Sequence, residues 1–393
     1  MPRARRFLVL AFACAASAAA LAAQTAAEIE ALVREGKLDE AIAAGRAAVA
    51  EAPGDPDRRV ALAHALQAKG RTARKVVDVA VGAEELRSGG LKLPRLGPGT
   101  PTRTEVRYDA QLLGEALRSL QEAERLAPGR KDVVLKRCYL LADSGDVSGA
   151  KEAVGRAAAA FPADPTLAET LAALGAVRVE AGDPAGGAAI LGAVAKAFPS
   201  SAPVHADWGY VLAQAGKKAE GLAALDRAAD LAPNDLAILR RRATAAMLVR
   251  DFARARSAYR ASAKTSGDPI DLLGAAAAAI ASDLAAAKSE LAGLARPEGA
   301  PPPVAEAAAD LLKAASRGPA ERGNLDQAET LVRDGMEILA LPILHRALRA
   351  SPADSRAAEI LAGIYRGFGF RSLADETKRA AQPPAKTAKG TSR

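Results

Sequence analysis

The chain has few aromatic residues, few cysteines and few histidines. Only 3% of its 393 residues are aromatic, although 50% are hydrophobic. Alanine, leucine and valine must therefore supply most of the apolar surface, and each of these side chains buries little area. Because small side chains let helices approach closely, a fold built from them needs many helices in mutual contact.

Motifs for catalysis and metal binding are missing as well. His64, His205 and His345 have no cysteine or carboxylate cluster at metal-ligand spacing beside them. The HExxH, phosphate-loop and GxSxG patterns do not occur in the sequence. An S-x-x-K match at Ser148 and Lys151 lacks the further motifs that enzymes using it require. We predict no enzymatic activity, no metal and no cofactor; an enzyme with a site dispersed over a groove is the less favoured alternative.

The positive net charge is confined to the two ends of the chain. Three arginines within the first six residues and five lysines and arginines after residue 377 account for the whole net charge of +8. The body between these ends is therefore neutral, which argues against a nucleic-acid-binding surface. The basic C-terminal tail, 382–393, is expected to be disordered and solvated.

The first 23 residues have the pattern of an export signal. A basic MPRARR precedes an apolar FLVLAFACAASAAALA, and Ala20-Leu21-Ala22 fits the small-x-small cleavage rule. The apolar run is short and rich in alanine for a membrane span. We predict that residues 1–23 are removed and that the protein is exported, either periplasmic or secreted. Lipidation at Cys14 and retention as a membrane anchor remain open, and oligomeric state is left undetermined.

An apolar helical run that ends in proline recurs along the chain. Pro128, Pro162, Pro199 and Pro233 follow one another at steps of 34, 37 and 34 residues. Glycine supplies the positive backbone angle that ends one helix and turns into the next, and proline closes the second helix. Each unit is therefore a pair of antiparallel helices that needs its neighbours to bury its apolar face. A glycine stands seventeen residues before the proline at Gly36, Gly145, Gly182, Gly216 and Gly335.

This pattern resembles the tetratricopeptide repeat. The 34-residue step, the turn in which Gly145 precedes Ala150, and the terminal proline carry the resemblance, which covers about two thirds of the chain. The first helices match less well, although Trp208-Gly209 keeps the family's aromatic-glycine pair. The resemblance implies an all-α, right-handed α-solenoid of antiparallel helix pairs. Cys138 then stands where a small packing residue is needed, and we expect it to be a buried spacer.

The predicted organisation follows from the repeats and from the breaks between them. RPEGAPPP interrupts the helical pattern near residue 298 and suggests a tight turn before one bridging helix. The predicted segments are a signal peptide (1–23), N-terminal repeats (24–90), a Pro/Gly loop (91–105), a central array (106–297), the Pro-rich turn and bridging helix (298–323), C-terminal repeats (324–381) and the basic tail (382–393).

The stretch KLPRLGPGTPTR within the loop at 91–105 departs from the alanine-rich surroundings. The separation between Pro53 and Pro128 slightly exceeds two repeat steps, and we interpret it as two repeats plus a short excess. The loop is then expected to replace the first helix of a repeat. It either leaves a notch in the inner wall or covers apolar surface with its leucines, and the second interpretation is favoured. Candidate partner-binding residues at such a notch are Arg95, Arg103 and Arg107.

The resemblance also implies a concave groove lined by the first helix of each pair. A protein or peptide partner would bind there, since tyrosine and arginine are effective anchors. Arg240 and Thr244 replace the family's carboxylate-binding Lys and Asn, so that pocket is not expected. The predicted function is an exported scaffold for envelope assembly, secretion or polysaccharide export, with a membrane-tethered assembly factor as the alternative. The groove candidates are Tyr139, Asp143, Tyr210, Gln214, Arg240 and Thr244.

Overall fold

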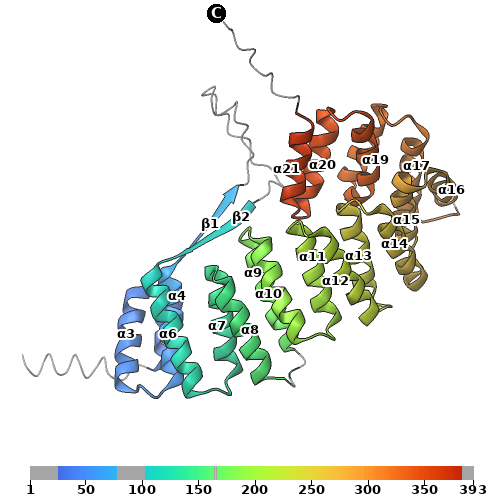
Figure 1. The fold of residues 1–393 in the computed structure, drawn as a ribbon. Helices are drawn as coiled ribbons and strands as arrows, with labels where there is room; N and C mark the ends of the chain where they lie inside the picture. Colours follow the sequence, from blue (N-terminus) through green and yellow to red (C-terminus); the bar gives the residue numbers. More distant parts are fainter. Residues whose placement is uncertain (1–24, 78–101, 163, 165, 297, 383–393) are drawn as a thin grey trace, which may run out of the picture. The chain divides into compact units, whose positions relative to one another are not determined.

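The computed structural model describes residues 25–77, 102–162, 164, 166–296 and 298–382 of the chain (Figure 1). Four predicted segments lie wholly or mostly outside these ranges: the predicted signal peptide, residues 78–90 of the predicted N-terminal repeats, the Pro/Gly loop and the basic tail. The described residues form 19 helices and two strands. They divide into two compact units, the first ending at Ala197 and the second beginning at Phe198.

The first unit consists of four antiparallel helix pairs, one of which is interrupted by a β-hairpin. Helix ends carry the expected caps; Thr25 forms a reciprocal capping box with Glu28, and Asp55 and Asp109 accept backbone hydrogen bonds at the start of their helices. The helices are α2 (Ala26–Arg34), α3 (Leu38–Glu51), α4 (Pro56–Gly70), α6 (Ala110–Leu126), α7 (Lys131–Ser144), α8 (Val147–Ala160), α9 (Leu167–Glu180) and α10 (Pro184–Ala197).

The second unit continues the pairs and contains one unpaired helix, α17, which begins just after the proline-rich turn. Prolines fit there because the first helical position needs no backbone donor. Its helices are α11 (Ala202–Gln214), α12 (Lys218–Leu231), α13 (Leu236–Leu248), α14 (Phe252–Ser266), α15 (Pro269–Ser282), α16 (Leu284–Leu294), α17 (Pro302–Ser316), α18 (Gly323–Arg333), α19 (Glu337–Ala350), α20 (Ser355–Gly367) and α21 (Arg371–Ala380).

The turns between paired helices have the geometry that the repeat pattern predicts. All five predicted turn glycines have positive φ, for example 90° at Gly145. Arg250 occupies the same position in the α13–α14 pair and has φ 72°. Because a side chain in this region is strained, Arg250 stands where the repeat favours glycine.

Small residues bring the paired helices together. A Cβ atom placed on Gly209 of α11 would lie 2.6 Å from the carbonyl oxygen of Gly221 on α12. Only glycine fits at such a backbone approach. Cys138 is fully buried and unpaired, as predicted for a packing spacer, and burial raises the pKa of its thiol to about 12.

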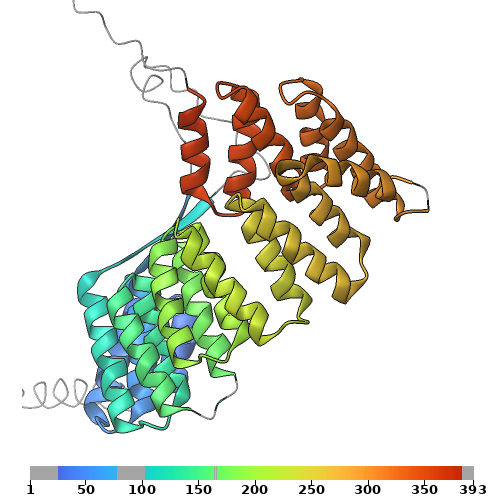
Figure 2. The same cartoon turned by 45° about the vertical axis from the view of Figure 1, so that its right-hand side comes forward.

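The region around the loop differs from the sequence prediction. Strand β1 (Arg71–Val77) follows α4 directly and pairs antiparallel with β2 (Thr102–Tyr108), which leads into α6 (Figures 1 and 2). Helices α4 and α6 pack against each other as the two helices of one repeat. The prediction of continuous helical repeats over 24–90 is therefore wrong at 71–77, and α6 does not lack a first helix.

The wrong prediction has a simple cause in the spacing of the prolines. When the segment from Arg71 to Tyr108 is taken out, the remaining separation between Pro53 and Pro128 equals that between Pro162 and Pro199, which is one repeat step. The hairpin is thus an insertion inside a repeat. The alternation of threonine and valine with charged residues in TRTEVRY favours a strand, a signal that the surrounding helical pattern obscures.

In the second unit the last helices fold back onto the earlier ones. Helix α19 packs against both α13 and α15. The turn between α20 and α21, Phe368 to Phe370, contacts α11. Residues on the first helices of this unit are therefore partly covered by the chain's own C-terminal repeats.

Candidate interaction surfaces

The first surface surrounds α7 and the base of the β-hairpin. The Asp143 carboxylate is only 3% exposed and accepts two hydrogen bonds from the Arg71 guanidinium, at 2.7 and 3.2 Å. The Tyr108 hydroxyl donates to the same carboxylate at 2.5 Å. A bidentate arginine with a tyrosine hydroxyl satisfies a buried carboxylate well, so these three side chains are held in one arrangement.

Tyr139 stands beside this arrangement, one helical turn before Asp143, and remains 41% exposed. Partial burial, followed by the nearby Asp143 carboxylate, raises the pKa of the Tyr139 hydroxyl. Burial is also the main cause of the raised pKa of Tyr108, with its hydrogen bond to Asp143 second. Both hydroxyls are therefore neutral donors at physiological pH. We call Arg71, Tyr108, Tyr139 and Asp143 the α7 cluster.

Polar contacts extend the α7 cluster across the first helices of the unit. The Tyr108 hydroxyl also interacts with Gln67 on α4. Further along, Nδ1 of His64 on α4 lies 2.6 Å from a carboxylate oxygen of Glu30 on α2. The three successive first helices α2, α4 and α7 thus each carry polar side chains, which suits recognition of an extended chain.

Tyr210 and Gln214, the groove candidates on α11, are engaged by the chain itself. The side-chain amide of Gln214 donates to the carbonyl of Phe368 at 2.8 Å, and the Tyr210 hydroxyl approaches the same oxygen at 3.4 Å. The Tyr210 ring meets the edge of Phe370 at a centroid distance of 5.7 Å. Both side chains thus form part of the packing between α11 and the last repeat.

Arg240 and Thr244 on α13 line one cavity of about 320 Å³. The Arg240 guanidinium donates to the buried Asp271 carboxylate at 2.9 Å and to Asp268 at 2.8 Å. Asp271 also accepts hydrogen bonds from the hydroxyls of Ser262 and Ser266. The positive charge of Arg240 is therefore neutralised within the chain, which weakens it as an anchor for an acidic partner.

The three loop candidates have different outcomes. Arg95 lies outside the described residues, and only the backbone of Arg103 is described, on strand β2. Arg107 is exposed on β2 and pairs with Glu105 at 2.7 Å. Since β2 belongs to an inserted hairpin, Arg107 cannot flank a notch left by a missing helix.

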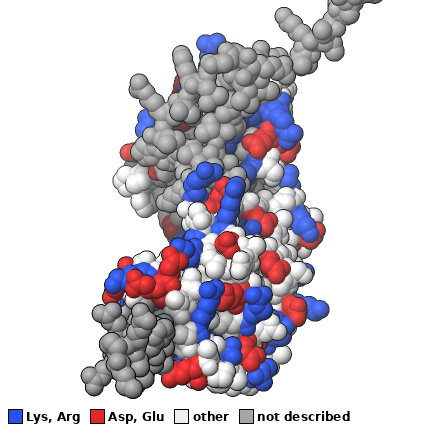
Figure 3. Space-filling view, turned by 90° about the vertical axis from the view of Figure 1, so that its left-hand side faces the viewer, with Lys and Arg blue, Asp and Glu red and all other residues white. Residues whose placement is uncertain are grey.

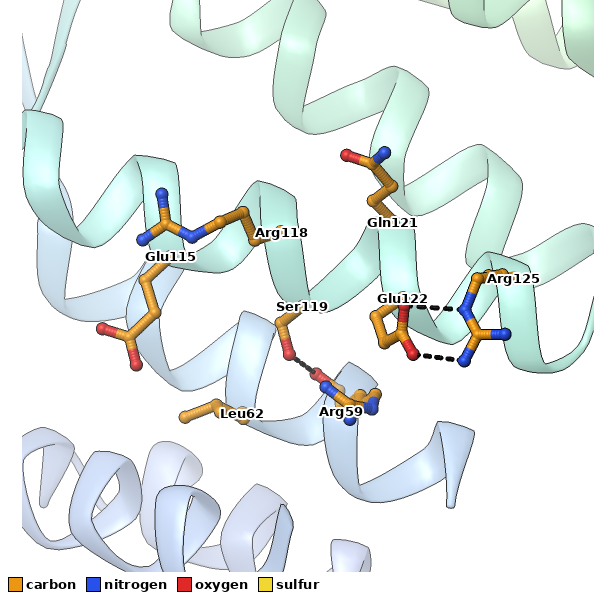
Figure 4. Close-up of a pocket in the computed structure, with 8 residues that line it drawn as sticks. All are labelled: Arg59, Leu62, Glu115, Arg118, Ser119, Gln121, Glu122 and Arg125. Atoms are coloured by element: carbon orange, nitrogen blue, oxygen red, sulfur yellow. Dashed lines mark hydrogen bonds and ion pairs between the residues drawn. The ribbon is translucent and has the colours of Figure 1, made fainter. Parts of the chain in front are cut away.

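A further cavity of about 610 Å³ lies between α4 and α6 (Figure 4). Its charges are largely compensated: Glu122 pairs with Arg125, and Glu115 pairs with Arg46 of α3. Ser119 donates to the backbone carbonyl of Arg59 at 2.9 Å. On the face drawn in Figure 3, positive and negative side chains are likewise interspersed. Such mixed charge gives no preference for an anionic or a cationic ligand.

Sequence reasoning identified Tyr139 and Asp143 but missed Arg71 and Tyr108, which complete the α7 cluster. The missed signal is the period-two pattern on both sides of the loop, which places Arg71 opposite Tyr108 in the hairpin register. Among the described residues, no group of three or more histidine, cysteine, aspartate or glutamate side chains could hold a metal ion. Within the same ranges, no helix combines the length and apolarity that crossing a membrane requires.

Comparisons with known proteins give structural likeness only. No protein-family model matches the chain, and no curated protein is found to be related to it. The chain is similar to PilF of Pseudomonas aeruginosa, at 20% identity over 46% of this chain and 82% of that one, with a TM-score of 0.29. It is similar to YrrB, described as a TPR protein with an unusual peptide-binding site, at 13% identity over 58% and 94% of the two chains (TM-score 0.29).

A third likeness is to PilW, described as a widely conserved type IV pilus biogenesis factor, at 20% identity over 47% and 85% of the chains (TM-score 0.30). Because all three TM-scores are below 0.5, neither fold nor function is drawn from them. The chain's own helix pairs, its turn glycines and its 34-residue step define it as an all-α repeat protein with tetratricopeptide-like units.

Proposed function

We propose that this protein is a non-catalytic, exported scaffold that binds a protein or peptide partner on the first helices of its first unit. The observation that carries the proposal is the α7 cluster, in which an exposed tyrosine stands beside a fixed, fully hydrogen-bonded polar group. Rigid aromatic side chains are effective anchors because they offer large contact area at a low cost in conformational entropy.

The side chains of the α7 cluster are preorganised for binding. Arg71, Tyr108 and Asp143 constrain one another, so little order has to be created when a partner docks on Tyr139. Tyr139 is 41% exposed, and the other large hydrophobic side chains exposed to a similar degree within the described residues, Leu272 and Val332, belong to the second unit.

The corresponding positions in the second unit support the choice of the first. Tyr210 and Gln214 contact Phe368 and Phe370, and Arg240 is paired with two aspartates. A partner there would have to displace the chain's own C-terminal repeat. The first unit is therefore the more accessible of the two groove candidates.

The proposed biological setting is supported by the pattern of the N-terminal segment and by fold-level analogy. Basic MPRARR followed by an apolar run supports export to the periplasm or beyond, and exported repeat proteins commonly serve envelope assembly, secretion or polysaccharide export. A membrane-tethered assembly factor is the second candidate, favoured by Cys14 within the apolar run. Intact-mass measurement of the exported protein distinguishes cleavage, lipid attachment and retention.

The binding proposal is tested by site-specific photo-crosslinking in envelope extract. A photoreactive residue at position 139 should capture one or a few defined partners, whereas the same residue at Val332, which is 39% exposed, should not. The wild-type protein should retain those partners in a pull-down, Tyr139→Ala should lose most of them, and Val332→Ala should keep them. If Tyr139→Ala retains the same partners at the same yield, the α7 cluster is not the binding surface.

A further inference from the structure

Another cavity, of about 850 Å³, lies within the second unit, and its lining has an excess of positive charge. It is bounded by the start of α12, the turn between α13 and α14, the end of α15 and the second half of α19. Lys218, Arg250, Arg254 and Arg349 line it, and Asp251 is the one carboxylate among its lining residues. We call this the cationic cavity.

The carboxylates near the cationic cavity do not cancel its charge. Asp251 caps α14 by accepting from the backbone amide of Arg254 and lies 3.7 Å from the Arg254 guanidinium. Asp226 lies 3.9 Å from the same guanidinium, so Arg254 is compensated. Arg250 reaches Glu376 at 3.2 Å, in a pair that is exposed on both sides and therefore weak. Within the described residues, Lys218 and Arg349 form no ion pair, so two of the four cations are uncompensated.

The buried imidazole of His345 lines the cationic cavity together with Lys218, Arg250 and Arg349. Burial lowers the pKa of His345 to about 3, and the charges of Arg250, Arg349 and Lys218 act in the same direction. His345 is therefore neutral, and Nε2 lies 2.8 Å from the Tyr365 hydroxyl. Lys218, Arg250 and Arg349 come from three different segments, and the neutral imidazole offsets none of their charges.

The backbone adds donors on the same side. Helix α12 begins after Lys217, whose side chain makes no capping hydrogen bond, and the first two residues of the helix, Lys218 and Ala219, line the cationic cavity. The backbone N–H groups at such an uncapped start are available to an anion, and the helix dipole favours negative charge there.

The floor of the cationic cavity is apolar. Leu222, Val249 and Phe252 are all at least nine-tenths buried and contribute to its lining. The Phe252 ring lies 5.8 Å from that of His345. A ligand here would place a charged group among the cations and an apolar or aromatic part against the floor.

We propose that the cationic cavity binds a phosphate-bearing small molecule, with its phosphate held by Lys218, Arg349 and the start of α12. Guanidinium and ammonium groups that line one cavity match a compact, multiply charged anion. An extended acidic peptide spreads its carboxylates along several residues, so only part of its charge would fit into one cavity. This inference goes beyond the proposed function, because it concerns another unit and another class of ligand.

The test uses the full mature chain and isothermal titration with inorganic pyrophosphate at low salt. The wild-type protein should bind one equivalent, and binding should weaken as salt is raised. Lys218→Gln together with Arg349→Gln should weaken it by roughly tenfold for each cation removed. The control, Lys264→Gln with Arg333→Gln, removes the same charge from exposed positions outside the cavity and should stay within about twofold of wild type.

Two outcomes would overturn the proposal. The first is that the Lys218/Arg349 variant binds pyrophosphate as strongly as the wild type, or that the wild type does not bind pyrophosphate at all. The other is a cavity-dependent affinity for a hexaglutamate peptide with no affinity for pyrophosphate, which would make the cationic cavity a peptide site. Thermal unfolding of each variant should match wild type, since Lys218 is half-buried and Arg349 is exposed. Tyr139→Ala should bind pyrophosphate normally, which separates this result from that of the proposed function.

Discussion

The backbone amide of Asp109 donates a hydrogen bond to the carbonyl of Gly70 at 3.0 Å, although the whole segment from Arg71 to Tyr108 lies between them in the sequence. Gly70 ends α4 and Asp109 caps α6, so this hydrogen bond closes the helix pair across the inserted β-hairpin. The two residues that flank the insertion therefore already lie within hydrogen-bonding distance of each other. The hairpin is an addition to a complete repeat.

Excision of the hairpin tests this relationship. Replacing residues 71–108 by two glycines also removes Arg71 and Tyr108, the partners of the buried Asp143 carboxylate, so the excision is combined with Asp143→Asn. This variant should preserve the helices and a cooperative unfolding transition, because Gly70 and Asp109 already meet. Circular dichroism should show a higher helical signal per residue than wild type. A control that deletes a segment of equal length elsewhere, from α7 into α9 (131–168), should abolish cooperative unfolding of the first unit. Loss of cooperativity in the hairpin deletion would show that the insertion is required for folding.

Arg71→Ala should destabilise the first unit, because it leaves the buried Asp143 carboxylate with Tyr108 as its main remaining partner. We expect a loss of roughly 1–3 kcal/mol in the free energy of unfolding, below the value for a fully buried pair because Arg71 is 32% exposed. Urea denaturation measures it. Adding Asp143→Asn should recover part of the loss, since no buried charge then lacks its partner. If the double variant is as unstable as the sum of the singles, the pair is not coupled.

The α7 cluster also shows how far the sequence could lead. The repeat pattern predicts the helix pairs, the turn glycines and the burial of Cys138, because these depend on spacing within one unit. It places Tyr139 and Asp143 one helical turn apart. It does not predict that Tyr108, from a distant strand, donates to Asp143. That contact depends on the insertion from Arg71 to Tyr108, which is about as long as one repeat and is therefore not visible in the spacing of the prolines. Nor does it predict that Phe368 covers Gln214, since the fold-back of the last repeats depends on packing around α19.

Arg250→Gly should stabilise the second unit. Arg250 has φ 72°, in a region that costs an ordinary side chain about 1 kcal/mol and glycine almost nothing. Its exposed pair with Glu376 offsets little of that gain, so we expect about 1 kcal/mol of added stability in urea denaturation. The matched control is Ser257→Gly, at an exposed position inside α14, which should lose about 0.5 kcal/mol. Equal losses at both positions would contradict the assignment of strain to Arg250.

His345 should make stability depend on pH. Burial lowers its folded-state pKa to about 3, whereas an unfolded histidine titrates near 6.5. The unfolded state therefore binds the proton more readily, so the contribution is complete above about pH 6.5 and is lost as pH falls toward 3. We expect His345→Gln to flatten the decline in unfolding free energy between pH 7 and pH 4, by roughly 2–3 kcal/mol. Parallel pH profiles for wild type and His345→Gln would show that His345 is not responsible.

Gly369 should be required for docking of the last repeat on α11. Its φ is 79°, and a Cβ atom at this position would lie 2.5 Å from the side-chain nitrogen of Gln214. Gly369→Ala therefore combines backbone strain with a clash against the residue that binds the Phe368 carbonyl, and we expect a loss of roughly 1–3 kcal/mol. Shortening Gln214 to alanine in the same chain removes the clash and should restore part of that loss.

The control for Gly369 is Gly363, which lies inside α20 with open space around it. Gly363→Ala should leave the docking intact and add up to about 1 kcal/mol, because alanine favours the helix. Limited proteolysis reports the docking directly: Gly369→Ala should expose sites around Phe368 to cleavage, and Gly363→Ala should not. Since Tyr210 is also covered by this turn, Gly369→Ala should increase labelling of a cysteine introduced in place of Tyr210, a probe that leaves Gln214 and its clash in place. Unchanged proteolysis and labelling in Gly369→Ala would mean that the turn tolerates a side chain and that α11 is covered by contacts other than Gly369.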